Sequence, residues 1–120
     1  MILWITGQSQ SGKTTLAKKL ISGQKNVIHL DGDETRKIWP GLSMSKEDRF
    51  EQCVRIARLA KYIDDQGYSV VISAIAPYEL LRIELEKICG CKFIFIDHDK
   101  FLDSDHPYEK PQNAIINVTR

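Results

Sequence analysis

Short hydrophobic runs alternate with longer amphipathic segments along the whole chain. Four apolar or β-branched runs predict buried strands: residues 1–6, 27–30, 69–76 and 92–96. Three segments with apolar side chains at helical spacing predict helices: residues 14–22, 45–67 and 77–90. The run at 92–96 is the last predicted strand. Strand and helix in this regular order predict an α/β fold, a three-layer α/β/α arrangement with a small parallel sheet in the middle.

The longest predicted helix has sequence signals at both ends. Ser45 and Asp48 resemble a capping box with Asp in place of Glu, and Gly67 marks the expected end. Helical periodicity directs its apolar side chains toward a core: Phe50, Cys53, Val54, Ala57, Ala60, Tyr62 and Ile63. Pro77 suits the first turn of the last predicted helix.

The composition narrows the class of protein. A chain of 120 residues with 42% hydrophobic residues suits one globular domain over residues 1–120. Its formal net charge of +1 argues against a nucleic-acid-binding surface. No apolar run approaches the ~20 residues of a membrane span, and the N-terminal residues lack the features of a signal peptide. Three cysteines, two of them in a Cys-Gly-Cys triplet, suit a reduced cytoplasmic protein better than a disulfide framework.

The first predicted strand runs directly into the sequence GQSQSGKT at residues 7–14. This sequence matches the phosphate-loop pattern G-x-x-x-x-G-K-[ST] in the required setting, after a strand and before a helix. Its glycines let backbone N–H groups face an anion, and the helix N-terminus adds partial positive charge. Lys13 is predicted to act on the β- and γ-phosphates as a catalytic residue, and Thr14 to bind Mg²⁺. The predicted ATP-binding residues are Gly7, Gln8, Ser9, Gln10, Ser11, Gly12, Lys13, Thr14 and Thr15.

Charged residues follow the second predicted strand in the sequence LDGDETR. Asp31, Asp33 and Arg36 are expected at the carboxyl edge of a parallel sheet, where α/β folds bind ligands. Asp33 is suited to accept a proton from an acceptor hydroxyl or to hold the water shell of Mg²⁺, and Arg36 to grip an anion. A solvated turn with a helix N-cap would explain the same residues, but the neighbouring phosphate loop favours a small-molecule kinase.

Five segments, in order, resemble landmarks of the adenylyl-sulfate (APS) kinases: WITGQSQSGKTTLAKKL, LDGDETRK, SKEDRFEQCVRIARLAKY, VVISAIAPYE and DHPYEKPQNA. These enzymes have the P-loop kinase fold and transfer the γ-phosphate of ATP to the 3′-hydroxyl of APS. The resemblance therefore implies a P-loop NTPase fold of the nucleotide-kinase type, with ATP and Mg²⁺ as cofactors. It also implies a small nucleotide-like acceptor and a role in sulfate assimilation, and it leaves a homodimer open.

The resemblance also implies roles for single residues. Asp33 matches the catalytic aspartate that works with the acceptor hydroxyl and Mg²⁺. Gln52 stands where the family usually has Asn, and Met44 where a Phe stacks on the acceptor adenine. Ala74 replaces a larger apolar residue beside that pocket. The positions matched to acceptor binding are Asp31, Arg36, Met44, Arg49, Gln52, Ser73, Ala74 and Ile75.

The largest departure from the family concerns the lid. APS kinases carry a segment rich in Arg and Lys between their last matched strand and the landmark matched by residues 105–109. Here only residues 98–104 separate Asp97 from Asp105, so the lid is predicted to be shortened or absent. Three interpretations stay open: a minimal APS kinase, a kinase for a different small-molecule hydroxyl, or a nucleotide-binding module without catalysis. The retained charged residues favour a kinase.

Overall fold

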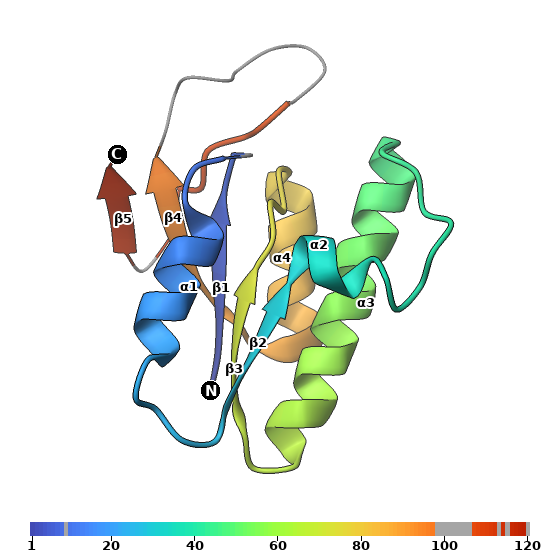
Figure 1. The fold of residues 1–120 in the computed structure, drawn as a ribbon. Coiled ribbons are helices and arrows are strands. Elements are labelled where there is room, and N and C mark those ends of the chain that lie inside the picture. Colours follow the sequence, from blue (N-terminus) through green and yellow to red (C-terminus); the bar gives the residue numbers. More distant parts are fainter. Residues whose placement is uncertain (9, 98–106, 113, 115, 120) are drawn as a thin grey trace.

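The protein is described by a computed structural model over residues 1–8, 10–97, 107–112, 114 and 116–119 (Figure 1). Its five strands form one parallel sheet in the order β2-β3-β1-β4-β5. The strands are β1 (Ile2–Gly7), β2 (Val27–Asp31), β3 (Ser69–Ser73), β4 (Lys92–Asp97) and β5 (Ile116–Thr119). The helices are α1 (Lys13–Ile21), α2 (Gly32–Thr35), α3 (Lys46–Asp65) and α4 (Glu79–Cys89). The predicted parallel α/β fold is confirmed.

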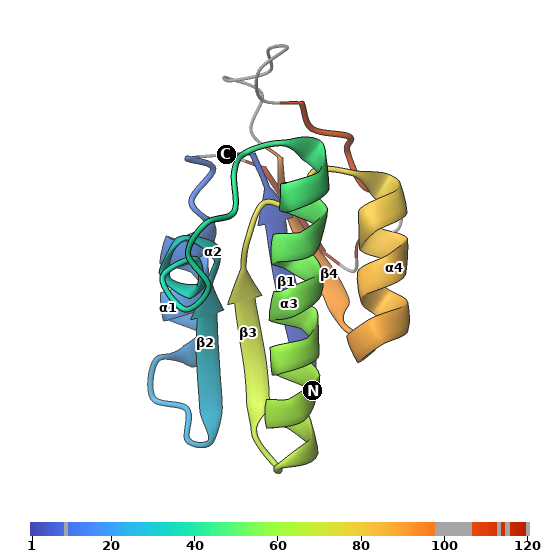
Figure 2. The same ribbon diagram turned by 90° about the vertical axis from the view of Figure 1, so that its right-hand side faces the viewer.

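Helices cover both faces of the sheet (Figure 2). On one face, Ala17 of α1 packs among Ile5, Val71 and Ile94. On the other face, α3 and α4 bury a larger core around Trp4, whose side chain is fully buried. Because the central strands are covered on both faces, their sequences are continuous apolar runs rather than alternating patterns. Among the described residues, no helix is long and apolar enough to cross a membrane.

Helix α3 begins with half of the predicted capping box. The Ser45 hydroxyl accepts a hydrogen bond from the Asp48 backbone N–H at 3.2 Å. The reciprocal bond is replaced, because the Asp48 carboxylate accepts from the backbone N–H and the hydroxyl of Ser43, both at 2.7 Å. This arrangement fixes the loop that leads into α3. Near the other end of the helix, Tyr62 was expected in the core but is 64% exposed.

Two boundaries and one additional strand differ from the sequence prediction. The strand predicted over 69–76 ends at Ser73, and the positive φ of 44° at Ala76 is incompatible with extended backbone there. Pro77 lies before α4 rather than in its first turn, and Tyr78 is the N-cap. A fifth strand follows residue 96, contrary to the prediction, and pairs with β4. The parallel strands nevertheless bring the residues after β1, β2 and β3 to one edge of the sheet.

Candidate active site

The phosphate loop joins the carboxyl end of β1 to the N-terminus of α1. A Cβ at Gly7 would lie 2.8 Å from Ser11 Oγ and 2.9 Å from the Ile96 carbonyl oxygen, so the backbone requires glycine there. Gly12 has a φ of 100° at the N-cap of α1, and no side chain caps this helix. The first N–H groups of α1 are therefore available to an anion.

The loop contains buried polar side chains beside the lysine of the motif. The Gln8 side-chain amide and Ser11 Oγ are buried without a hydrogen-bond partner among the described residues. Lys13 Nζ donates to the Gln8 carbonyl oxygen at 2.6 Å. Burial lowers the pKa of Lys13 to about 8, while the charges of Asp33 and Asp31 partly oppose the shift. A bound polyphosphate would pair the lysine and restore its charged form.

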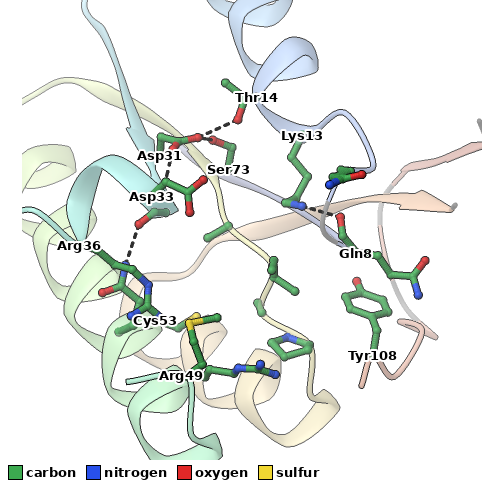
Figure 3. Close-up of a pocket in the computed structure, with 18 of the residues that line it drawn as sticks. Gln8, Lys13, Thr14, Asp31, Asp33, Arg36, Arg49, Cys53, Ser73 and Tyr108 are labelled. Carbon is green, nitrogen blue, oxygen red and sulfur yellow. Dashed lines mark hydrogen bonds between the residues drawn. The ribbon is translucent and has the colours of Figure 1, made fainter. Parts of the chain in front are cut away.

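The Asp31 carboxylate, at the end of β2, accepts hydrogen bonds from four donors, and Figure 3 shows it between Thr14 and Ser73. Its Oδ1 accepts hydrogen bonds from Thr14 Oγ1 and Ser73 Oγ, both at 2.8 Å. Its Oδ2 accepts from the backbone N–H groups of Asp33 at 3.1 Å and Glu34 at 3.3 Å, so Asp31 is also the N-cap of α2. Burial opposes the charge of Asp31, but these hydrogen bonds outweigh it and lower its pKa. Asp31 is thus both the helix N-cap that the sequence allowed for and a charged residue of the site.

A pocket of about 600 Å³ connects the phosphate loop with the ends of β2 and β3 and with α3 (Figure 3). Asp33 lines it together with these predicted ATP-binding residues: Gln8, Gln10, Gly12, Lys13, Thr14 and Thr15. It is also lined by every predicted acceptor-binding residue: Asp31, Arg36, Met44, Arg49, Gln52, Ser73, Ala74 and Ile75. Gly7 and Ser11 are not among the lining residues, and Ser9 lies outside the described residues. The fold therefore gathers both predicted sets in one place.

The part of the pocket near α3 combines cations with apolar and sulfur-containing side chains. Arg36 Nη1 donates to the carbonyl oxygens of Leu42 at 3.3 Å and Ser43 at 3.4 Å, which orients the guanidinium. Burial raises the pKa of Cys53 to about 12, so this thiol stays neutral. Met44 is 58% exposed at the pocket rim. This region suits an acceptor that has an anionic part and a less polar part.

The Gln52 amide is used within the protein. Its Nε2 donates to the Gly32 carbonyl oxygen at 2.9 Å and to Thr35 Oγ1 at 3.1 Å. Its Oε1 accepts a hydrogen bond from Trp39 Nε1. Gln52 therefore joins α3 to α2 and supports the backbone beside Asp33, while its side chain forms part of the pocket wall.

Tyr108 brings the segment after residue 106 to the pocket wall. Its hydroxyl lies 2.7 Å from Thr6 Oγ1, immediately before the phosphate loop, and its ring stacks on Phe95 with centroids 5.7 Å apart. Burial raises the pKa of Tyr108 to about 12, so the hydroxyl stays protonated at neutral pH. The segment is thereby fixed against β1 and β4.

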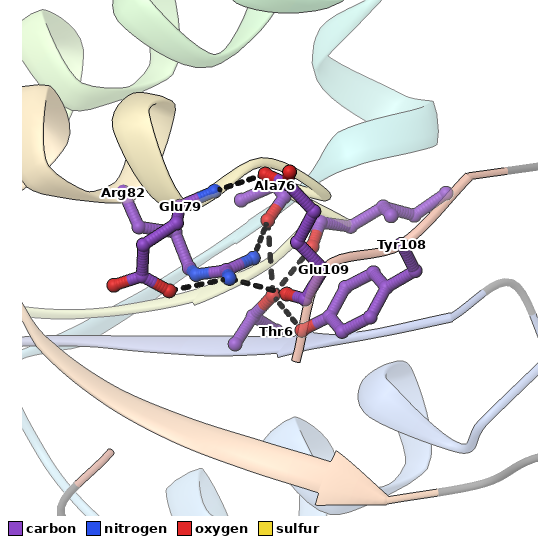
Figure 4. Close-up of polar contacts among 7 residues, drawn as sticks. Thr6, Ala76, Glu79, Arg82, Tyr108 and Glu109 are labelled. Carbon is purple, nitrogen blue, oxygen red and sulfur yellow. Dashed lines mark hydrogen bonds and ion pairs between the residues drawn. The ribbon is translucent and has the colours of Figure 1, made fainter. Parts of the chain in front are cut away.

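The buried side chain of Arg82, on α4, holds this segment against the loop after β3 (Figure 4). Its Nη1 donates to the Ala76 carbonyl oxygen at 2.6 Å, and its Nη2 donates to Glu79 Oε2 at 2.8 Å and to the Glu109 carbonyl oxygen. The Glu109 N–H donates to the Pro77 carbonyl oxygen at 2.8 Å. The Glu79 N–H in turn donates to Glu109 Oε1 at 2.8 Å. One guanidinium thus joins two separate stretches of backbone, at Ala76 and at Glu109, and also pairs with the Glu79 carboxylate.

Sequence reasoning missed several residues of the pocket wall: Gly32, Cys53, Ala76, Pro77, Pro107 and Tyr108. Three of them, Gly32, Cys53 and Ala76, are next to predicted site residues in the chain, and Pro77 follows Ala76. Tyr108 is different, because it lies far along the chain from the phosphate loop. Its only sequence signal is its place in the landmark DHPYEKPQNA, which carries no spatial information by itself.

The phosphate loop lies between β1 and α1 of a parallel sheet, and carboxylates from the end of β2 lie in the same pocket. These features define a P-loop nucleotide-binding domain of the kinase type. The sequence profile of adenylylsulphate kinase matches residues 1–104. The chain therefore belongs to the adenylylsulphate kinase family, which confirms the predicted resemblance.

Individual relatives agree with this assignment. The chain is 37% identical over 103 residues to a cytidine diphosphoramidate kinase of Campylobacter jejuni, covering 82% of this chain and only 61% of that protein. It is 33% identical over 142 residues to an adenylyl-sulfate kinase of Microcystis aeruginosa, covering 95% of this chain and 78% of that one. That alignment is longer than the 120 residues of this chain, so the relative has positions with no counterpart here. Among solved structures, the Mycobacterium tuberculosis APS kinase CysC in complex with AMPPNP and APS has a TM-score of 0.85 at 25% identity, over 98% of this chain and 87% of that one.

Proposed function

We propose that this chain is an ATP- and Mg²⁺-dependent kinase that transfers the γ-phosphate of ATP to a hydroxyl of a small, anionic, nucleotide-like acceptor. The observation that carries the proposal is the pocket itself. Lys13 and Thr14 of the phosphate loop line the same pocket as Asp33, Arg36 and Arg49. An anion cradle beside a carboxylate and two arginines suits transfer between two anionic substrates.

The residues around Thr14 fit a magnesium ion. Mg²⁺ prefers oxygen ligands, and the Thr14 hydroxyl lies 2.8 Å from Oδ1 of an Asp31 carboxylate whose pKa is lowered. When bound, Mg²⁺ would neutralise charge on the phosphates. The contacts support Asp31 rather than Asp33 as the carboxylate next to Thr14. Asp33 is the carboxylate with the largest favourable effect on the charge of Lys13, which suits a role beside the transferred phosphoryl group.

In this proposal each charged residue has a separate task. The phosphate loop and Lys13 bind the triphosphate and orient its last phosphate. Asp33 orients the acceptor hydroxyl and accepts its proton. Arg36 and Arg49 hold the anionic part of the acceptor. The retention of the full set in one pocket supports catalysis over a nucleotide-binding module.

Two acceptors deserve direct comparison, namely APS and cytidine diphosphoramidate. Membership of the family supports APS. The name of the Campylobacter relative supports a cytidine diphosphate conjugate. Among the described pocket residues, Tyr108 is the one aromatic side chain, and it stacks on Phe95. The acceptor base would therefore pack on Met44 rather than on an aromatic ring. The absence of ring stacking lowers the expected preference for a large purine base.

The shortened lid is part of the same proposal, although residues 98–106 lie outside the described residues. Two observations support it. The described chain leaves the sheet at Asp97 and returns to the pocket wall as early as Pro107. The adenylyl-sulfate kinase of Microcystis aeruginosa also has positions with no counterpart in this chain.

The test is a transfer assay with ATP, Mg²⁺ and each acceptor in turn, in which mass spectrometry detects the phosphorylated acceptor and ADP is measured in parallel. A phosphorylated product with either acceptor supports the proposal and identifies the acceptor class. ATP binding without ADP formation would overturn it in favour of a nucleotide-binding module. The matched control is Asp33→Asn, which should bind ATP with nearly unchanged affinity and transfer no phosphate.

A further inference from the structure

A chain of hydrogen bonds extends from the Asp31 carboxylate to the imidazole of His29. Ser73 Oγ donates to Asp31 Oδ1 at 2.8 Å, and His29 Nε2 lies 2.7 Å from the same hydroxyl oxygen. The sheet register explains this grouping, because Asp31 of β2 pairs with Ser73 of β3 and their side chains share one face. His29 precedes Asp31 by two positions on β2 and therefore lies on that same face.

The chemistry of the three groups fixes the direction of these hydrogen bonds. The Asp31 carboxylate is ionised and can only accept, so the single hydroxyl hydrogen of Ser73 is used toward Asp31. Ser73 must then accept from His29, whose Nε2 carries the hydrogen. His29 therefore prevents the Ser73 hydroxyl from rotating away from Asp31. Ser73 is only 3% exposed, so water does not replace this partner freely.

We propose that His29 is a positioning residue that acts through Ser73 to hold Asp31 in place beside Thr14 and the magnesium ion. This inference rests on the proposed Mg²⁺-dependent use of ATP. Groups that orient the immediate partners of a metal ion commonly contribute about tenfold or more to metal affinity. His29 would act as such a group, because the side-chain hydrogen bond it makes among the described residues is to Ser73 rather than to the phosphate loop or Thr14.

The competing explanation is that His29 only helps to join β2 to β3. The strands are already paired in register from Val27 and Ser69 to Asp31 and Ser73. Loss of one side-chain hydrogen bond leaves that backbone pairing intact. A structural role therefore predicts a change in stability without a change in the magnesium dependence of nucleotide binding.

The experiment measures AMPPNP binding by isothermal titration calorimetry, in Mg²⁺ and in EDTA, and so needs no acceptor. His29→Leu and Ser73→Ala are each expected to weaken Mg²⁺-supported binding roughly tenfold and to leave binding in EDTA unchanged. Because both act through one contact, the double variant should be no weaker than the weaker single variant. His29→Gln keeps an N–H donor and should restore part of the lost affinity.

Ser69→Ala is the matched control, because Ser69 lies at the opposite end of β3 from Ser73. It should leave both affinities unchanged, and thermal unfolding of each variant checks that it is folded. Additive losses in the double variant, or equal losses in Mg²⁺ and EDTA, would overturn the inference. A normal magnesium effect with no phosphate transfer to any acceptor would instead overturn the proposed function and leave this inference standing.

Discussion

The charge of Lys13 gives the site a pH dependence that can be measured directly. Burial lowers its pKa to about 8, so a growing fraction of unliganded protein loses this charge as the pH rises through that value. ATP affinity is expected to fall from neutral pH toward about pH 9.5, by at most about tenfold for each pH unit. Isothermal titration calorimetry with AMPPNP at a series of pH values would measure this fall in affinity.

The same lowered pKa has the opposite effect on stability. The unfolded chain holds the lysine proton more tightly than the folded chain, so the unliganded protein should become more stable as the pH rises above about 8. Lys13→Arg keeps its charge over this range and should flatten both pH profiles. Wild-type affinity that is constant over the range would show that Lys13 is fully charged before ATP binds.

Met44 offers a separate test of the acceptor base. The side chain lies at the pocket rim and is 58% exposed, so a larger ring can be placed there without disturbing the core. Met44→Phe is expected to tighten APS binding at least about fivefold, since stacking on a base contributes roughly 1–3 kcal/mol. The affinity for a cytidine conjugate should increase less, because cytosine has a smaller ring system than adenine to stack on the phenylalanine. Equilibrium binding of both ligands measures the difference, with Met44→Leu as the non-aromatic control. Unchanged APS binding in Met44→Phe would show that this position does not face an adenine.

Single residues of the site could be predicted where they belong to a local sequence pattern or to a motif of the family. The phosphate loop needs only a contiguous octapeptide, and Asp31, Asp33 and Arg36 follow a strand whose end must lie at the ligand-binding edge. The contacts of Asp31 with Thr14 and Ser73 were not predictable, because they join three separate strand or helix ends. The partners of Gln52 were missed for the same reason, since α2 is a single turn without a hydrophobic pattern.

The contacts that Arg82 of α4 makes predict that its replacement strongly lowers the stability of the protein. Arg82→Met keeps the length of the side chain but leaves the buried Ala76 carbonyl oxygen and the Glu109 carbonyl oxygen without their donor. The free energy of unfolding is expected to fall by about 2–4 kcal/mol. Urea denaturation would measure it.

The matched control is Arg58→Met on the exposed side of α3, which should change the free energy of unfolding by less than about 0.5 kcal/mol. If both variants were equally stable, the Arg82 contacts would contribute no net stability. ATP affinity should also fall in Arg82→Met, because Tyr108 of the same segment contacts Thr6 before the phosphate loop.

Among the elements, those with a strong repeating pattern were predicted and those fixed by distant pairing were not. The three longer helices and the four apolar strands carry periodic or continuous hydrophobic signals. Strand β5 has four residues, and its partner β4 lies about twenty positions earlier in the chain. Parallel pairing over such a distance depends on tertiary packing, for which a four-residue sequence provides no signal.

At the level of the whole molecule, the sheet brings every proposed functional group to one edge. The strands are parallel throughout, so Gly7, Asp31 and Ser73 end at the same side, and Tyr108 returns there from beyond β4. The residues available to cover this edge after β4 are few, because Asp97 and Pro107 are separated only by residues 98–106. In a kinase, a covering segment excludes water, which otherwise competes with the acceptor hydroxyl.

This architecture predicts ATP hydrolysis in the absence of any acceptor. If the lid is short, as proposed, ADP should form slowly from ATP and Mg²⁺ alone, because water would reach the γ-phosphate. The accepted substrate should then shift the reaction from hydrolysis to transfer. A coupled ADP assay, with inorganic phosphate measured in parallel, distinguishes the two outcomes. Lys13→Met is the control and should abolish both, which excludes a contaminating ATPase. ADP formation that requires the acceptor would show that the pocket excludes water, and that the segment after β4 is compatible with a closed active site.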